Sequence, residues 1–421
     1  EKHALITRKS AAEGMVLLKN SDNTLPMKNI SNIALIGSSS YEFIAGGTGS
    51  GDVEEAYSIA LDDALTKNGF EINDVALNEY FIQNAKNLKD KEGDTEIPGA
   101  IGVAMSMMNP YTPIKMDYST ELLNQISAAS DIAIVTIGRN SGESSDRVLD
   151  DDFLLSKKEE QMIKKTCDVF HSKGKKVIVI LNIGGVIETS SWKNQPDAIL
   201  LAWQGGQEGG NSVVDILTGK VNPSGKLPMT FPVDINDHKS TLNFPMDGEK
   251  LELTDMIFGV DYDKPENEKI RNKDYTVYEE GIYVGYRHFD KNDIKVSFPF
   301  GYGLSYTNFE YSDLEVIKQD QKINLSLKIK NTGDVKGKEI IQVYISKINS
   351  KIDRPTKELK GFSKTRLLNV AESSILDIEI PLSDFSYWNE EINNWSIENG
   401  EYNILVGSSS RDIKLEEKIK I

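Results

Sequence analysis

Four short, largely apolar runs, each followed at once by a turn rich in glycine, serine or asparagine, constrain the fold of this chain most strongly. Runs of this kind are typical of strands buried on both faces, and their alternation with helices is typical of βα units around a parallel sheet. We therefore predict an α/β domain with a mainly parallel sheet, preceded by a helix over residues 8–18. The runs cover residues 33–36, 132–137, 177–181 and 198–202, and helical spacing of apolar residues is found at 57–67, 155–173 and 209–217.

The turns that follow the four runs are expected to lie together at one edge of the sheet. Their glycines allow positive φ and let a ligand or another backbone come close, although tight strand-to-helix turns would explain them as well. In open α/β sheets ligands bind at the carboxyl ends of the strands, so this edge is the predicted binding rim. The turns are residues 37–40, 138–147, 182–185 and 204–207.

One carboxylate stands in the second of these turns. Glu143 lies in the segment Gly138-Arg-Asn-Ser-Gly-Glu-Ser-Ser-Asp-Arg147, directly after the apolar run 132–137. This place makes Glu143 the first candidate for acid–base chemistry, although a glutamate in a loop is usually only solvated. Arg147 is expected either to orient the loop or contact substrate hydroxyls, or to form an ordinary ion pair.

Charge and composition exclude several classes of partner. The formal net charge of −17 would repel nucleic acid and anionic membrane surfaces, and no basic patch offsets it. The longest apolar run, 177–187, is too short for a bilayer span of roughly 20 residues. The single cysteine, Cys167, cannot form an intrachain disulfide and is expected to be a buried apolar residue rather than a nucleophile. A cytoplasmic location is favoured, with secretion as the alternative.

No pattern indicates a metal or a cofactor. The glycines of 46–51 fit neither a P-loop nor a dinucleotide-binding fingerprint, and the four histidines are far apart in the sequence. The acidic run 150–152 is expected to be a solvated turn or a helix N-terminus rather than a cation site. A Gly-x-Ser-x-Gly nucleophile elbow does not follow any predicted strand.

The residue composition of the chain changes after the predicted α/β domain. Residues 1–235 are expected to form the α/β domain, 236–306 an extended connection, and 307–421 a small β-sandwich. Residues 322–330 alternate strictly between apolar and polar, as expected for a strand with one buried face. Further strands are predicted at 340–345, 376–380, 402–406 and 413–421.

Five ordered motifs, spread over essentially the whole chain, resemble those of the glycoside hydrolase family 3 β-glucosidases. The resemblance implies a six-stranded α/β sandwich followed by a fibronectin type III-like domain. The motifs are Ala11-Ala-Glu-Gly-Met-Val-Leu-Leu-Lys-Asn20, Trp203-Gln-Gly-Gly-Gln-Glu-Gly-Gly210, Asn222-Pro-Ser-Gly-Lys-Leu-Pro-Met-Thr-Phe-Pro232, Val284-Gly-Tyr-Arg-His-Phe-Asp290 and Phe298-Pro-Phe-Gly-Tyr-Gly-Leu-Ser-Tyr-Thr307.

This resemblance also implies a reaction and a role for Glu143. The family hydrolyses terminal β-glycosides with retention, using an Asp nucleophile on a (β/α)8 barrel and a Glu acid/base on the sandwich. Glu143 matches the acid/base in a loop similar to the family's Gly-Glu-Gly-x-Asp-Arg pattern, with Ser144 in place of the second glycine. Ser141, Gly142 and Arg147 are expected to contact the substrate, a β-glucoside or short oligosaccharide.

The chain departs from the family in one large respect, because it contains no barrel. A permuted order with the barrel downstream is the preferred explanation, with a barrel upstream or on a second chain as alternatives. The β-domain either braces the sandwich or offers a surface for a homo-oligomer. A noncatalytic carbohydrate-binding or assembly module is the alternative function, and a β-xylosidase is the alternative within the enzyme class. N-acetylglucosaminidases of the family mostly lack this sandwich glutamate, so Glu143 argues against them.

Overall fold

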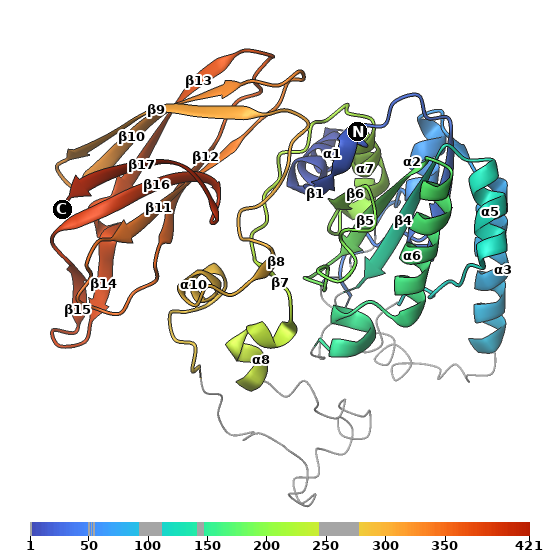
Figure 1. Cartoon of the computed structure of the whole chain (residues 1–421), viewed down its shortest axis with the longest axis horizontal. Coiled ribbons are helices and arrows are strands. Elements are labelled where there is room, and N and C mark those ends of the chain that lie inside the picture. Colours follow the sequence, from blue (N-terminus) through green and yellow to red (C-terminus); the bar gives the residue numbers. More distant parts are fainter. Residues whose placement is uncertain are drawn as a thin grey trace, which may run out of the picture. The chain divides into compact units, whose positions relative to one another are not determined.

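The computed structural model describes residues 2–48, 51, 53, 55–91, 112–140, 147–243 and 278–421. The chain divides into two compact units (Figure 1). The first, residues 1–221 with 234–279, is called the α/β unit; the second, residues 222–233 with 280–421, is called the β unit. Among the described helices, none is both long and apolar enough to cross a membrane.

The α/β unit is built around one six-stranded sheet with the strand order β1–β6–β5–β4–β2–β3. Strands β2 to β6 run parallel to one another, whereas β1 runs antiparallel to β6. The predicted mainly parallel α/β fold is therefore confirmed, and the strand number agrees with the family resemblance. The strands are β1 (Val16–Asn20), β2 (Asn32–Ile36), β3 (Glu71–Ile72), β4 (Ile132–Arg139), β5 (Lys176–Ile183) and β6 (Ala198–Leu201).

Helices cover both faces of this sheet, and Figure 1 shows the sheet between α7 and α6. The long strands are buried accordingly: every residue of β4 is buried, and every residue of β5 except the first. Burial on both faces explains why these strands read as continuous apolar runs. The helices of the unit are α1 (Lys2–Gly14), α2 (Leu61–Lys67), α3 (Asp74–Lys91), α5 (Thr120–Ala128), α6 (Lys157–Ser172), α7 (Gly209–Leu217) and α8 (Lys239–Asn243).

The predicted helix over residues 8–18 is wrong at its C-terminal end. Helix α1 ends at Gly14, and the next residues form strand β1 beside β6. Met15, Val16, Leu17 and Leu18 are four consecutive side chains with at most 1% exposure. A surface helix would bury only one stripe of such a run, whereas a strand covered on both faces buries all of it.

The β unit contains two antiparallel sheets, with the strand orders β13–β10–β9 and β12–β11–β16–β17. The predicted β-sandwich is confirmed, and β10 buries every second side chain as its alternation indicates. Its inward side chains, Ile323 and Leu325 among them, belong to one core shared by both sheets. The strands are β9 (Phe309–Gln319), β10 (Lys322–Asn331), β11 (Ile340–Lys347), β12 (Glu358–Lys364), β13 (Ser373–Pro381), β16 (Glu401–Ser409) and β17 (Asp412–Lys420).

Shorter elements complete the β unit. Two small antiparallel pairs, β7 with β8 and β14 with β15, lie outside the main sheets. Helix α10 and strand β8 lie within residues 236–306, which were predicted to be an extended connection, and β7 lies just before that segment. The elements are β7 (Phe231–Pro232), β8 (Val296–Phe298), α10 (Tyr286–Lys291), β14 (Ser386–Asn389) and β15 (Asn394–Ile397).

Cys167 lies on α6 and is buried, as predicted. Burial raises the pKa of its thiol to about 12. Because the thiolate is the nucleophilic form of cysteine, this environment keeps Cys167 unreactive near neutral pH. It packs as a small apolar residue.

Asp197 is a polar anchor at the amino-terminal end of the sheet. Its carboxylate accepts hydrogen bonds from the Val177 N–H at 2.8 Å, from the Lys176 ammonium at 2.9 Å and from His171 at 2.8 Å. Burial by itself would raise the pKa of this carboxyl, but these contacts outweigh it and the pKa is lowered. Stabilisation from a carboxyl with a lowered folded pKa is present above the ordinary value of about 4 and is lost as pH falls through the folded pKa.

We predict that Asp197→Asn lowers the free energy of unfolding by about 1 to 2 kcal/mol at pH 7, because the Val177 N–H and Lys176 lose a charged acceptor. The difference from wild type should shrink as the pH falls toward 3. Urea unfolding of both proteins at pH 7, 5 and 3 measures it. Asp22→Asn is the matched control, since Asp22 bonds to the same lysine but its side chain is 80% exposed. A difference in unfolding free energy that does not change with pH would contradict the link between the lowered pKa of Asp197 and stability.

Candidate functional site

The described parts of the four predicted turns share one edge of the sheet. Strands β2, β4, β5 and β6 are parallel neighbours, so the turns at their carboxyl ends lie on the same side of the sheet. A backbone hydrogen bond of 3.2 Å from the Gly184 N–H to the Arg139 carbonyl joins the turns after β5 and β4. This edge is called the rim below.

Asn182, at the end of β5, holds three segments of the rim together. Its amide oxygen accepts from the Ile44 N–H at 2.6 Å, and its amide nitrogen donates to the Ile44 carbonyl at 2.9 Å. The same nitrogen donates to the Trp203 carbonyl at 2.8 Å, beyond the end of β6. Asn182 is fully buried, so its side-chain amide satisfies backbone groups of the rim and is not exposed to a ligand.

Two glycines of the rim are required by close packing. Gly37 has φ +93°, and a Cβ there would lie 2.7 Å from the Thr136 carbonyl oxygen. A Cβ on Gly138 would lie 2.9 Å from Cγ of Pro113 and nearer still to the Ser39 side chain. Such approaches exclude a side chain, so these glycines let the turns after β2 and β4 pack together.

The structure describes only part of the predicted catalytic turn. Ser141, Gly142 and Glu143 lie outside the described residues, and so does Ser144. Their predicted roles therefore stay predictions. The described residues that flank this segment are Asn140 and Arg147.

Arg147 forms a bidentate ion pair with Asp152. Its Nη2 lies 2.6 Å from Oδ1 of Asp152, and its Nε lies 3.0 Å from Oδ2. Its Nη1 donates to the Val186 carbonyl, just beyond the turn after β5. The Arg147 side chain is 41% exposed. Arg147 therefore does form an ion pair, and its predicted contact with substrate hydroxyls stays a prediction.

A second, buried ion pair holds the strand that leads into the turn. Arg139, the last residue of β4, bonds to Glu159 on α6 with Nη1–Oε1 and Nη2–Oε2 distances of 2.6 and 2.8 Å. Its Nε donates to the main-chain carbonyl of Asp152 at 3.0 Å. This pair was not predicted from the sequence; the only local signal is Ser156 three residues before Glu159, the spacing of a capping box.

The acidic run 150–152 lies in a short π-helical turn, Leu149–Phe153, just before α6. Asp151 has φ +63°, and its carboxylate, 60% exposed, pairs with Lys115 at 2.7 Å. Asp152 pairs with Arg147 instead. The described residues contain no group of three or more His, Cys, Asp or Glu side chains that could hold a metal ion.

The buried carboxylates of the described part of the α/β unit are all engaged in structural contacts. Glu159 holds Arg139. Glu188 accepts from the N–H and hydroxyl of Ser191. The remaining two are Glu208, bonded by Tyr57 and Asn211, and Asp215, bonded by Arg8. Each of these carboxylates therefore has donors that compete with any role in proton transfer.

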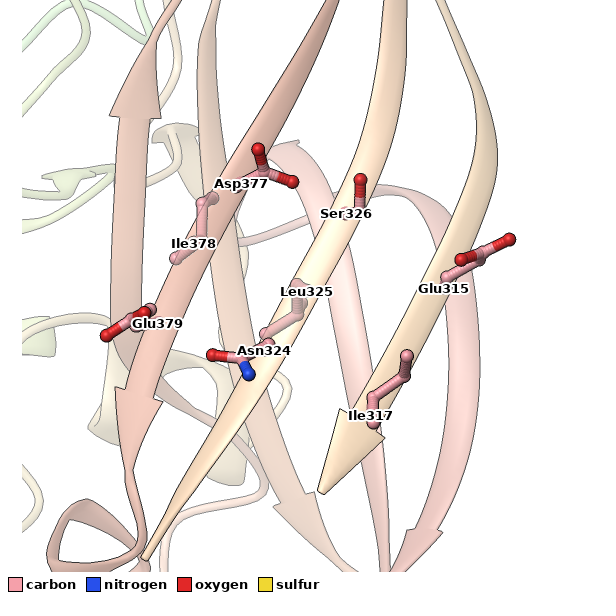
Figure 2. A pocket seen from close by; sticks show the side chains of 8 residues that line it. All are labelled: Glu315, Ile317, Asn324, Leu325, Ser326, Asp377, Ile378 and Glu379. Atoms are coloured by element: carbon pink, nitrogen blue, oxygen red, sulfur yellow. The ribbon is translucent and has the colours of Figure 1, made fainter. Parts of the chain in front are cut away.

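Each unit has a hollow among its described residues. One, of about 520 Å³, lies in the α/β unit beside the turn after β6 and is lined by α1 residues such as Ile6 and by Trp203 and Gln204, without a titratable side chain. The other, of about 260 Å³, lies on the outward face of the β13–β10–β9 sheet, and Figure 2 shows its lining side chains on three adjacent strands. Its carboxylates are exposed on a sheet face, where water solvates them, so we assign no chemistry to it.

Comparisons with known proteins agree with this architecture. The model of the glycosyl hydrolase family 3 C-terminal domain matches residues 15–286, and that of a fibronectin type III-like domain matches residues 339–410. The solved structure of β-glucosidase 3B from Thermotoga neapolitana in complex with glucose is similar, with a TM-score of 0.86 and 40% identity; the match covers 100% of this chain and 54% of that one.

Curated relatives point the same way. Thermostable β-glucosidase B of Acetivibrio thermocellus is 34% identical over 427 residues, a match that covers 100% of this chain and 48% of that protein. β-Glucosidase A of Butyrivibrio fibrisolvens is also 34% identical, over 99% of this chain and 50% of that protein. The chain thus spans about half the length of the relatives it matches. Because the family model covers most of the chain and its α/β sheet and β-sandwich are both present, the chain belongs to glycosyl hydrolase family 3.

Proposed function

We propose that this chain is the acid/base-bearing part of a retaining exo-β-glucosidase that hydrolyses terminal nonreducing β-D-glucosyl residues. The observation that carries the proposal is the match of the whole chain to about half of a solved β-glucosidase that binds glucose. The Glu143 segment supports it, because it follows β4 in the sequence and β4 ends at the rim, the edge at which α/β sheets bind ligands.

Glu143 is the proposed general acid/base. In the first step it protonates the leaving glycosidic oxygen while an Asp on the barrel attacks C1, so the C1–O bond breaks and a glycosyl ester forms. In the second step the Glu143 carboxylate removes a proton from water, which attacks C1 and releases glucose with its β configuration retained. The engagement of the described buried carboxylates of the α/β unit supports the choice of Glu143.

Ser141, Gly142 and Arg147 are proposed to contact the substrate. The Arg147 guanidinium has five N–H donors, and its bonds to Asp152 and Val186 leave some of them for a sugar hydroxyl. This role is compatible with its ion pair. It is tested by the KM of an Arg147→Lys variant, in which the bidentate geometry is lost but the charge is kept.

The partner of this chain is proposed to be a (β/α)8 barrel, on the same precursor or on a second polypeptide, that supplies the nucleophile. The support is the coverage of about half of each relative. A barrel of this kind has about 250 residues. We propose no metal and no cofactor for the reaction.

We predict that the 421-residue chain alone does not hydrolyse p-nitrophenyl β-glucoside, and that activity requires the barrel polypeptide. The reason is that a general acid without the nucleophile cannot form the glycosyl ester. Native mass spectrometry of the purified material, with a parallel assay of each species, measures this. Turnover by a species that contains only this chain would contradict the proposal, and glucose binding by that species without turnover would favour the noncatalytic module.

A further inference from the structure

We infer that Asp152 is a positioning residue for Glu143, because it ties both flanks of the Glu143 segment to a single turn. The inference rests on the proposed function, since it gives Glu143 the role of acid/base. Asp152 itself is not proposed to touch the substrate. It acts through Arg139 on one flank and Arg147 on the other.

The first tie is made by the Asp152 side chain. Its carboxylate accepts two N–H groups of Arg147, with the Nη2–Oδ1 and Nε–Oδ2 distances of 2.6 and 3.0 Å, and also the Val148 N–H at 3.2 Å. The planar guanidinium meets the carboxylate in a fork geometry that fixes direction as well as distance. The Arg147 Nη1 bond to the Val186 carbonyl adds a third point of attachment for the C-terminal flank.

The second tie is made by the Asp152 main chain. Its carbonyl accepts Nε of Arg139 at 3.0 Å, and Arg139 ends β4, the strand that leads into the segment. The guanidinium of Arg139 is clamped in turn by Glu159, whose carboxylate also accepts the Ser156 N–H at 2.8 Å in the capping box of α6. Arg139, Glu159 and Ser156 are each at most 9% exposed. The N-terminal flank is therefore held by a buried network.

The turn that carries Asp152 is itself fixed. Phe153 is 3% exposed, and its carbonyl accepts the Glu188 N–H at 2.7 Å. The Phe153 N–H donates to the Val148 carbonyl at 3.1 Å. Both described flanks of the segment thus connect to one anchored turn.

Holding these flanks matters for general acid catalysis more than for folding. An acid must lie within hydrogen-bond reach of the oxygen that it protonates, and a displacement of about 1 Å can cost about 10²-fold in rate. The Arg147–Asp152 pair is partly exposed, with side chains 41% and 24% accessible, and such pairs add little to stability. The bidentate geometry of the Arg147–Asp152 pair therefore fits a positioning role better than a stabilising one.

The test uses Asp152→Asn in the active assembly of this chain with its barrel. The variant keeps the main-chain carbonyl that binds Arg139 but removes the charge that holds Arg147. We expect kcat/KM for cellobiose to fall about 10- to 100-fold, while kcat/KM for 2,4-dinitrophenyl β-glucoside changes less than about threefold, because its leaving group needs little protonation. Asp151→Asn is the matched control: it breaks the neighbouring ion pair with Lys115, and both substrates should react as with wild type.

Gly185→Ala is a second variant that leaves every charge in place. A Cβ at position 185 would lie 2.9 Å from Nη1 of Arg147, so the methyl group pushes the guanidinium away from its present place. We expect the same selective loss on cellobiose. The variant provides the test independently if Asp152→Asn fails to fold.

Glu143→Gln, assayed beside these variants, distinguishes a failure of the positioning role from a failure of the proposed function. If Glu143→Gln loses cellobiose selectively but Asp152→Asn and Gly185→Ala lose both substrates equally or neither, the positioning role is overturned and the proposed function stands. If Glu143→Gln itself shows no selective loss, the proposed function fails and the inference fails with it. Selective loss in all three variants, with Asp151→Asn unchanged, supports both.

Discussion

In the assembly with the barrel, Glu143→Gln should lower kcat/KM for cellobiose about 10³-fold, while 2,4-dinitrophenyl β-glucoside loses less than about tenfold. Glucose is a poor leaving group and needs a proton on the glycosidic oxygen as the C1–O bond breaks. Dinitrophenolate leaves without one, so formation of the glycosyl ester from the aryl glycoside should survive the change. Steady-state kinetics on the two substrates measures the difference.

Glu160→Gln is the matched control for this prediction. Glu160 is an exposed carboxylate near the start of α6, so its loss removes the same charge without touching the rim. It should leave both substrates within about twofold of wild type, since exposed charges contribute little. An equal loss on both substrates in Glu143→Gln would instead indicate a binding or structural role for this glutamate.

The second large effect is on stability, and it concerns Arg139. Arg139→Met should lower the free energy of unfolding by about 3 kcal/mol, because it leaves Glu159 buried without its cation. The two side chains are only 10% and 9% exposed, so water cannot readily replace the lost partner. Urea unfolding at pH 7 gives the value.

Two companion variants sharpen this measurement. Arg139→Met combined with Glu159→Gln should recover part of the loss, since glutamine removes the unpaired charge while its side-chain oxygen can still accept the Ser156 N–H. Lys164→Met breaks an exposed ion pair with Asp168 on the same helix and should cost less than about 1 kcal/mol. If Arg139→Met costs no more than Lys164→Met, the buried pair does not stabilise the fold in this way.

The local pattern of apolar residues was sufficient to predict the central strands of the parallel sheet. Strands β4 and β5 are buried along nearly their whole length, so each appears in the sequence as one apolar run. Strand β1 was predicted as part of a helix because Met15 to Leu18 continue the apolar spacing of α1. Its pairing with β6 is a tertiary contact, which the periodicity of a single segment cannot indicate. Strand β3 has only two residues, too few for any pattern.

The edge of the sheet at which β4 ends was predictable from the sequence, but the contacts around it were not. Parallel strands bring their carboxyl ends to one edge, so the position of the end of β4 at the rim followed from the order of strand and turn. Asp152 could not be distinguished from its neighbours Asp150 and Asp151, because the three differ only in the contacts they make. Those contacts reach Arg139 and Arg147 from a turn whose geometry depends on the packing of Phe153.

The most direct test of the account is the product that Glu143→Ala forms from 2,4-dinitrophenyl β-glucoside in the presence of azide. Without a general base the glycosyl ester reacts slowly with water, whereas azide needs no deprotonation: it attacks C1, the new C1–N bond forms and the barrel carboxylate leaves. Two inversions give β-glucosyl azide, which NMR identifies. If Glu143 is the acid/base, azide restores turnover and yields this β-azide only in the Glu143 variant. Unchanged turnover with glucose as the sole product would contradict an acid/base role for Glu143.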